Sequence, residues 1–241
     1  MIPKIIHYCW FGRNPLPPLA VKCIDSWKKY FPDYEIKEWN EDNFDVNIIP
    51  YTEEAYRLKK YAFVSDYARF WILYHYGGLY FDTDVEVIKS MDDIIARGPF
   101  MGLEKMDGSG VGIIAVAPGL GLGCESGNRI CKDMLEFYKH THYVSWAGKM
   151  TGTVVDFTTT IILSKAQLKN DQINYCNSVY IYPDEYFDPM NYYTGEILIT
   201  ENTRSIHRYA SSWLNNRSIL KKICSRIHSI LVRLIVTFKS L

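Results

Sequence analysis

The residue types best suited to chemistry are two aspartates, Asp82 and Asp84, in the run Leu79-Tyr-Phe-Asp-Thr-Asp. If this run is a strand, its period of two places Tyr80, Asp82, Asp84 and Glu86 on one face. Facing carboxylates repel one another or share a cation, and the hard ions Mg²⁺ and Mn²⁺ prefer oxygen ligands. If such an ion also held a diphosphate, the site would have the parts needed to transfer a group from a nucleotide.

The segment before this run carries three further polar candidates. Ser65, Asp66 and Arg69 fall on one face of an expected helix, because Asp66 and Arg69 have i,i+3 spacing. Gly77-Gly78 offers the positive φ that ends a helix, so Asp66 and Arg69 are expected to face the same cleft as the two aspartates. A surface ion pair beside solvated carboxylates is the alternative. A lone D-x-D would favour that alternative, whereas the whole ordered string favours a site.

The surrounding pattern predicts an α/β fold that positions these side chains. A strand, helix, strand succession opens the chain and is typical of a parallel sheet. Thr52 is expected to cap a long helical stretch that has room for one break. The expected strands cover residues 2–10, 34–39, 79–88, 178–182 and 197–200, and the expected helices cover 19–30, 52–75, 128–140 and 157–167.

The formal net charge of zero divides into two opposite parts. The chain of 241 residues has 27 basic and 27 acidic residues, and residues 204–241 hold eight Lys or Arg with no Asp or Glu. The balance is therefore −8 (19 minus 27) before Arg204 and +8 from Arg204 onward. A neutral total argues against a general nucleic-acid binder. The hydrophobic content of 48% argues against a disordered chain.

Two parts are expected along the chain: a single α/β domain over residues 1–217 and a basic amphipathic helix over 218–241. In the second part, apolar residues at helical spacing lie opposite Lys221, Lys222, Arg226 and Arg233. Such a helix suits the surface of an anionic membrane. Packing of this helix on the domain or on a partner is the alternative.

The compartment is inferred from cysteines and from targeting signals. Six cysteines are scattered without a C-x-x-C pair, which favours free thiols in a reducing compartment over a disulfide framework or a zinc site. The first residues make a poor signal peptide, and no apolar run reaches the length of a membrane span. We therefore expect a cytoplasmic protein, peripheral on the inner face of the cell membrane.

These motifs resemble glycosyltransferase family 32, which includes bacterial capsular-polysaccharide transferases and the yeast initiating mannosyltransferase. The similarity runs from Ile2-Pro-Lys-Ile-Ile-His-Tyr-Cys-Trp-Phe-Gly through residues 62–84 to His207 and Ser212-Trp213. It implies a GT-A fold, which is Rossmann-like, with a nucleotide-sugar donor, a divalent metal (Mn²⁺ or Mg²⁺) and retention of anomeric configuration.

The resemblance also implies roles for single residues. Asp84 would ligate the metal, Asp82 would contact metal-bound water and the donor, and His207 could reach the metal or diphosphate, so Asp82 and Asp84 are the catalytic candidates. The residues implied to bind substrate are Trp10 against the nucleobase, Asp66, Arg69 and Tyr80 around the donor sugar, and Ser212 and Trp213 over the β-phosphate. Trp10 also follows from the expected first strand, because ligands of α/β sheets bind beyond the carboxyl ends of strands.

No carboxylate stands out as a nucleophile. Glu104 and Glu125 flank the glycine-rich region and either approach the acceptor or are solvated loop acids. A front-face attack, with the leaving phosphate as base, needs neither of them. His7 is expected to be a satisfied strand histidine and not a ligand.

The motifs and the resemblance together predict a transferase of a hexose from UDP-galactose, UDP-N-acetylgalactosamine or UDP-glucose, and the resemblance alone implies that the transfer is retaining. The acceptor is expected to be a glycan or an undecaprenyl-linked oligosaccharide in capsule or surface-glycan synthesis, and no nucleic-acid partner is expected. Two other functions compete. A non-catalytic sugar-binding module would not explain the grouped acids and arginine. A phosphatase of the haloacid-dehalogenase type would need Thr where Glu86 stands.

Overall fold

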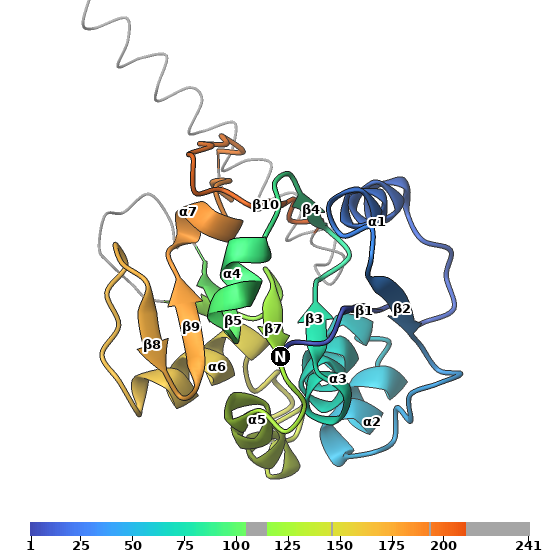
Figure 1. Cartoon of the computed structure of the whole chain (residues 1–241). Helices are drawn as coiled ribbons and strands as arrows, with labels where there is room; N and C mark the ends of the chain where they lie inside the picture. The colour runs from blue at the N-terminus through green and yellow to red at the C-terminus, as the bar shows by residue number, and fades with distance from the viewer. Residues whose placement is uncertain (105–114, 146, 193, 211–241) are drawn as a thin grey trace, which may run out of the picture.

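An eight-stranded sheet forms the centre of the computed structural model, which describes residues 1–104, 115–145, 147–192 and 194–210 (Figure 1). Its strand order is β2-β1-β3-β7-β5-β9-β8, with β6 paired to β5. The strands are β1 (Ile5–Cys9), β2 (Glu35–Trp39), β3 (Gly78–Tyr80), β5 (Phe100–Leu103), β6 (Val116–Ala117), β7 (Leu122–Cys124), β8 (Asn174–Cys176) and β9 (Val179–Tyr182).

The sheet is mixed, whereas the sequence predicts a parallel one. Strands β1, β2, β3, β5 and β9 share one direction, and β7 lies antiparallel between β3 and β5. The carboxyl ends of β1, β3 and β5 therefore meet at one edge of the sheet. Trp10, the D-x-D and Glu104 directly follow these strands, so the topology gathers them at that edge.

Helices cover both faces of the sheet. One hydrophobic cluster includes buried residues of α2 (Pro50–Arg57), α3 (Tyr61–Tyr76), α5 (Arg129–Lys139) and α6 (Val154–Leu163). The other includes buried residues of α1 (Pro18–Tyr30), α4 (Asp92–Arg97) and α7 (Asp184–Phe187). Within β3, Leu79 packs into the second cluster and Tyr80 into the first, as the alternation of a strand requires.

The predicted helix over 52–75 is two helices. The break falls at Leu58 to Lys60, where Lys59 has a left-handed φ of 57°. Thr52 is not the N-cap, because α2 begins at Pro50 after Ile49, and the Thr52 hydroxyl donates to the Ile49 carbonyl (3.0 Å). Proline suits the first helical turn because it has no N–H to leave unpaired.

The prediction of a single strand over residues 79–88 is wrong, and the difference changes where the D-x-D lies. The chain leaves β3 at Tyr80, and a turn closed by Val85 N–H to the Asp82 carbonyl (3.0 Å) leads into β4 (Val85–Val87). Strand β4 pairs antiparallel with β10 (Ser205–His207) in a separate two-stranded sheet. The D-x-D therefore lies in a turn between two sheets, and its carboxylates need not share a strand face.

Two other expectations concern the later part of the chain. No strand forms over 197–200, because Ile197 makes only an isolated bridge with Met190. The helix expected over 218–241, and with it the boundary at 217, lies outside the described residues. Within the described ranges, no helix is long and apolar enough to cross a membrane.

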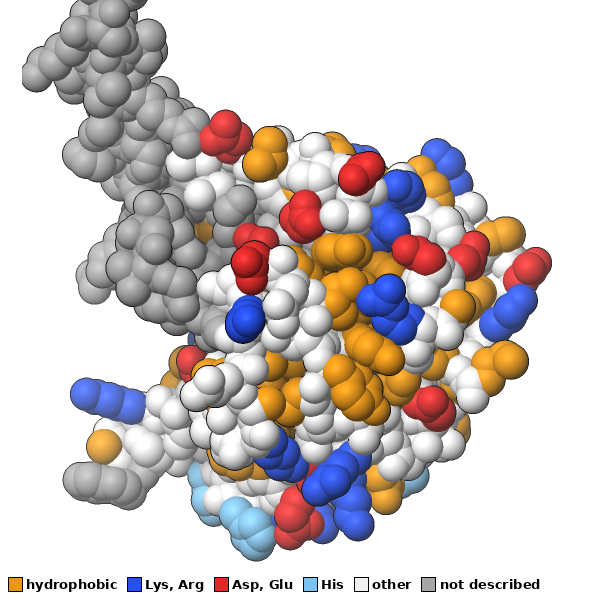
Figure 2. Space-filling view, turned by 60° about the vertical axis from the view of Figure 1, so that its left-hand side comes forward, with side chains coloured by type: hydrophobic (Ala, Val, Ile, Leu, Met, Phe, Trp, Pro, Cys, Tyr) orange, Lys and Arg blue, Asp and Glu red, His pale blue; other side chains and the backbone are white. Residues whose placement is uncertain are grey.

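The surface shown in Figure 2 has mixed character. Hydrophobic side chains lie there among both acidic and basic ones. The large hydrophobic residues exposed on the protein include Tyr175 and Leu198. On the described part of this face, no single sign of charge dominates, unlike the basic face that nucleic-acid binding uses.

His7 is a satisfied strand histidine. Its Nδ1 accepts from Trp39 Nε1 (3.0 Å), and its Nε2 lies 2.9 Å from the Gly77 carbonyl, so Nε2 carries the proton. Burial lowers the pKa of His7 from 6.5 to about 4. The neutral ring thus ties β1 to the end of α3.

Acidification should therefore weaken the fold through His7. Below pH 6.5 the His7 ring takes up a proton in the unfolded chain, whereas in the folded chain it does so only near pH 4. The contribution of neutral His7 to the free energy of unfolding is therefore complete above pH 6.5 and is lost as the pH falls. We expect the free energy of unfolding of wild type to fall by about 2–3 kcal/mol more than that of His7→Gln between these limits. Urea denaturation across this range measures it, and parallel pH profiles of the two proteins would contradict it.

Candidate active site

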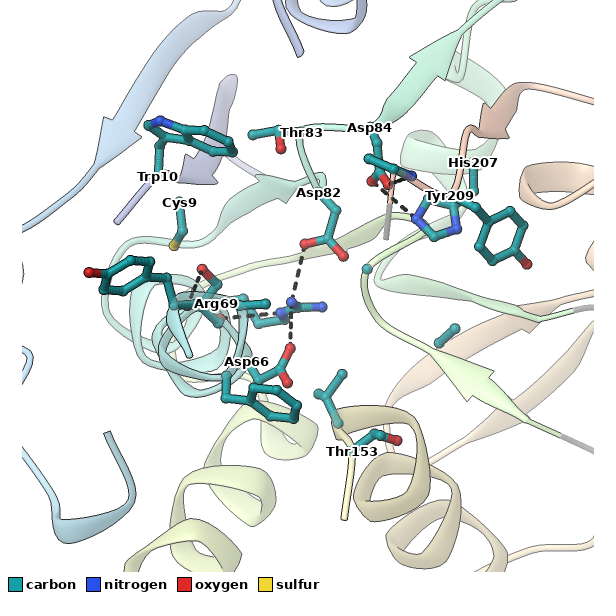
Figure 3. Close-up of a pocket in the computed structure, with 18 of the residues that line it drawn as sticks. Cys9, Trp10, Asp66, Arg69, Asp82, Thr83, Asp84, Thr153, His207 and Tyr209 are labelled. Atoms are coloured by element: carbon teal, nitrogen blue, oxygen red, sulfur yellow. Dashed lines mark hydrogen bonds and ion pairs between the residues drawn. The ribbon is translucent and has the colours of Figure 1, made fainter. Parts of the chain in front are cut away.

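A cavity of about 820 Å³ opens at the carboxyl edge of the sheet. Most of the residues predicted to act line it: Trp10, Asp66, Arg69, Tyr80, Asp82, Asp84 and His207. Ser212 and Trp213 lie outside the described residues. Two groupings of charge face this cavity, one around Arg69 and the other around Asp84 (Figure 3).

Arg69 organises the first grouping. Its Nη2 lies 2.8 Å from Asp66 Oδ1 and 3.1 Å from Asp82 Oδ1, and its Nε donates to the Ser65 carbonyl (3.3 Å). The guanidinium is centred 4.9 Å from the Tyr80 ring, whose hydroxyl is 3.3 Å from Asp82 Oδ1. The i,i+3 pair expected from the sequence therefore forms and is buried, with the Arg69 side chain only 3% exposed.

The charges in this grouping depend on one another. Burial raises the pKa of Asp66 to about 7, and Arg69 opposes that rise. Burial also raises the pKa of Asp82, against the attraction of Arg69. For the Arg69 guanidinium, burial lowers the pKa, but the nearby carboxylates more than offset this and keep it charged. The single cation Arg69 thus pairs with two acids. Its Nη1 is buried but has no hydrogen-bond partner among the described residues.

Asp84 and His207 form the second grouping. His207 Nε2 lies 3.1 Å from Asp84 Oδ1, and Ala210 N–H donates to Asp84 Oδ2 (2.8 Å). Burial alone would raise the pKa of Asp84, yet His207 lowers it to about 2. Burial would lower the pKa of His207, yet Asp84 raises it to about 9. The two side chains are therefore an ion pair at neutral pH.

The side chains at this point fit part of a divalent metal site. Carboxylate oxygen and the nitrogen of a neutral imidazole are ligands that Mn²⁺ accepts, so His207 would have to give up its proton to bind the ion. Asp84, in the turn before β4, and His207, on β10, bring these two groups together. Across the described ranges, no group of three or more His, Cys, Asp or Glu side chains is placed to hold a metal ion. Asp82 turns toward Arg69, while Asp84 turns toward His207 (Figure 3). A metal held here would need further ligands, such as donor phosphate and water.

Gly119 fixes the position of Asp82. Its carbonyl accepts from Asp82 N–H (3.1 Å), and a Cβ on Gly119 would lie 2.0 Å from Asp82 Oδ2 and 3.1 Å from Arg69 Nη1. The absence of a side chain at Gly119 thus leaves the space that the Asp82 carboxylate occupies.

Replacing Gly119 by Ala should push the Asp82 carboxylate away from Arg69. We expect turnover to fall by about tenfold to a hundredfold, because small misplacements of reacting groups are that costly. Steady-state kinetics measure the effect. Gly127→Asn is the control, since a Cβ there meets nothing within 4 Å and Asn tolerates its φ of 73°. Equal activity of Gly119→Ala and wild type would contradict the role.

Trp10 lies at the rim of the cavity. Its backbone N–H donates to the Trp39 carbonyl (2.8 Å), and its Nε1 donates to the Asn14 carbonyl (2.6 Å). These bonds hold a partly exposed ring beyond the end of β1. The position suits stacking against a flat ligand.

Sequence reasoning treated the two glutamates alike, and the structure separates them. Glu104 follows β5 and lines the cavity. Glu125 follows β7, whose opposite direction carries it to the other edge of the sheet. Sequence reasoning also missed Tyr209, whose hydroxyl lies 2.6 Å from the fully buried Asp188. No sequence signal marks Tyr209, because its role comes from a left-handed φ of 49°.

Part of the chain is similar to known proteins. Residues 17–101 match the family described as "Glycosyltransferase sugar-binding region containing DXD motif". Inositol phosphoceramide mannosyltransferase 1 of Schizosaccharomyces pombe is 28% identical over 111 residues, which are 42% of this chain and 33% of that protein. Mannosyl phosphorylinositol ceramide synthase CSH1 of Saccharomyces cerevisiae is 33% identical over 109 residues, 42% of this chain and 28% of that protein.

A relative from Candida albicans and one solved structure extend the comparison. The initiation-specific alpha-1,6-mannosyltransferase of that yeast is 29% identical over 119 residues, 45% of this chain and 31% of that protein. The solved structure named PaToxG Glycosyltransferase has a TM-score of 0.43 and 20% identity, covering 56% of this chain and 59% of that one. The chain thus matches less than half the length of each of these curated relatives.

The fold and site define a mixed α/β protein with an acidic, arginine-anchored cavity at the carboxyl edge of its sheet. Residues 17–101 of the chain are similar to the sugar-binding region of glycosyltransferases that contain a DXD motif.

Proposed function

We propose that this protein is a metal-dependent glycosyltransferase that moves a hexose from a nucleotide-sugar to a hydroxyl acceptor. The observation that carries the proposal is the pairing of two charged groupings, Arg69 with Asp82 and Asp84 with His207, across one cavity. A sugar-binding module needs no such arrangement. The strand directions support a GT-A fold, and the family resemblance supports a retaining reaction.

The residues of the cavity divide the work of binding the donor. Trp10 stacks on the nucleobase, and Asp66, Arg69 and Tyr80 hold the sugar and phosphates. The unpartnered Nη1 of Arg69 is a ready donor for a sugar oxygen or phosphate. Asp84, with Asp82 and His207, holds Mn²⁺ or Mg²⁺, which neutralises charge on the departing diphosphate.

The donor remains a nucleotide-linked hexose. UDP-galactose, UDP-N-acetylgalactosamine and UDP-glucose are the candidates from the sequence analysis, and the relatives' names, which refer to mannosyl transfer, lead us to add GDP-mannose to them. The acceptor belongs to surface glycans, such as a capsule precursor or an undecaprenyl-linked oligosaccharide. The basic amphipathic pattern of residues 218–241 supports peripheral attachment to an anionic membrane on the cytoplasmic side.

Release of free nucleotide tests the activity directly. The full chain is incubated with each of the four donors and Mn²⁺, and UDP or GDP is measured without any acceptor. Slow release from at least one donor, stopped by EDTA and restored by Mn²⁺, is the expected result. Donor binding without release would indicate a sugar-binding module. If the protein showed no binding and no release, both functions would be excluded.

A further inference from the structure

The cavity lining has a second acidic part apart from the D-x-D, a wall that holds Glu104 and Asp156. Glu104 directly follows β5, which lies two strands from β3 in the sheet, so the carboxyl ends of these two strands are about 9–10 Å apart at neighbour spacing. Gly119, beside Asp82, also lines the cavity. A gap of this width has room for a sugar ring.

Glu104 is held by one oxygen and open at the other. Its Oε1 lies 3.3 Å from the Tyr209 hydroxyl, which also lies 2.6 Å from Asp188 Oδ2. Its backbone N–H donates to the Ala115 carbonyl (2.8 Å). Within the described ranges, Oε2 of Glu104 has no hydrogen-bond partner and is not sealed from the cavity. The carboxyl group therefore offers one oxygen to a ligand.

Tyr209 is fixed from several sides. Its backbone is left-handed, with a φ of 49°, and its ring lies 4.3 Å from the His207 ring and 5.0 Å from the Tyr192 ring. A non-glycine residue keeps such a conformation only where its surroundings impose it. Tyr209 thus sets the distance between Glu104 and the Asp84–His207 pair.

The charge of this wall indicates which ligand it accepts. Its charged side chains, as far as the structure describes them, are Glu104 and Asp156. Burial raises the pKa of Glu104, the charge of His207 and the hydrogen bond from Tyr209 lower it, and Asp156 adds a smaller rise. The lysines that line the cavity, Lys59 and Lys60, lie before α3 on the donor side. Carboxylates accept hydrogen bonds from hydroxyls and repel phosphate.

We propose that this wall is the acceptor subsite and that it takes an uncharged polyol, that is, a neutral sugar. One hydroxyl of this sugar hydrogen-bonds to Glu104, and the neighbouring hydroxyl attacks the donor. Tyr209 is the positioning residue for Glu104. The inference rests on the proposed function and adds to it the class of acceptor near the reacting centre.

The test compares neutral and anionic forms of the same probes. Methyl glycosides of mannose, galactose and glucose, and their 6-phosphates, are added to the full chain with donor and Mn²⁺. Nucleotide release above the acceptor-free rate measures transfer. At least one neutral glycoside should stimulate release, and its 6-phosphate should do so about tenfold less or worse.

Variants separate the acceptor wall from the donor site. Glu104→Gln should lower the ratio of transfer to hydrolysis by about tenfold to a hundredfold, the usual effect of losing a charged hydrogen bond. Tyr209→Phe should raise the KM for the glycoside more than it lowers kcat. Glu125→Gln, at the other edge of the sheet, should leave the ratio unchanged. A proportional loss of transfer and hydrolysis in Glu104→Gln, or equal use of the 6-phosphates, would overturn the assignment.

Saturation-transfer NMR with the same glycosides decides the matter without turnover. We expect signals from a neutral glycoside with wild type and their loss with Glu104→Gln. No signal from any glycoside, or an unchanged signal in the variant, would overturn the acceptor subsite. Absence of nucleotide release from every donor would instead contradict the proposed function.

Discussion

Replacement of Asp84 by Asn is expected to lower nucleotide release and transfer by about a thousandfold or more, because the proposed metal ligand and its charge are lost together. Asn keeps the size of the side chain and can still accept from Ala210 N–H, which now bonds to Asp84 Oδ2. The fold should therefore survive while the affinity for Mn²⁺ falls. Release assays and Mn²⁺ titration by electron paramagnetic resonance measure the two effects.

Two controls sharpen this prediction. Asp92→Asn removes an exposed acid at the start of α4 that does not line the cavity, and it should leave both activity and Mn²⁺ binding unchanged. EDTA should silence wild type to the level of Asp84→Asn. Activity that persists in EDTA would show that the Asp84–His207 pair acts without a metal.

Replacement of Arg69 by Met should damage stability and activity together. The side chain is 3% exposed and contacts both Asp66 and Asp82, so its loss leaves two acids near each other without a cation. Breaking a buried pair in this way costs about 3–5 kcal/mol of unfolding free energy. Chemical denaturation measures the loss, and donor hydrolysis should become undetectable.

The double variant Asp66→Asn, Arg69→Met isolates the cause. Removing one acid should return part of the lost stability, because less charge is then left unpaired. Activity should stay absent, because the contact of Arg69 with Asp82 and its free Nη1 are still missing. If the double variant were no more stable than Arg69→Met, the loss would come from packing and not from charge.

The sequence predicted the structure correctly where a local pattern of residues is compatible with only one local structure. The i,i+3 spacing of Asp66 and Arg69 and the double glycine after the helix predicted a pair that faces the cleft of the two aspartates, and both side chains line the cavity. The alternation from Tyr80 to Glu86 predicted one strand, and the chain instead turns at Asp82. Alternation of side chains looks the same in one strand and in two short strands joined by a turn.

Long-range pairing explains the remaining differences. Strand β4 is stabilised by β10, and β7 enters the sheet antiparallel between β3 and β5. Neither partner can be read from nearby residues, because strand pairing depends on the whole topology. The same holds for Glu104 and Tyr209, which meet across 105 positions of the chain.

The pairing of β4 with β10 also determines the order in which the two charged groupings of the site form during folding. Arg69 and Asp82 belong to the first half of the chain, but the partner of Asp84 is 123 positions away on the last described strand. Contacts between such distant segments form late, because closing a long loop costs entropy before any contact is gained. A chain still emerging from the ribosome would therefore hold the arginine grouping before the histidine pair, and catalysis would await synthesis of residues 205–210.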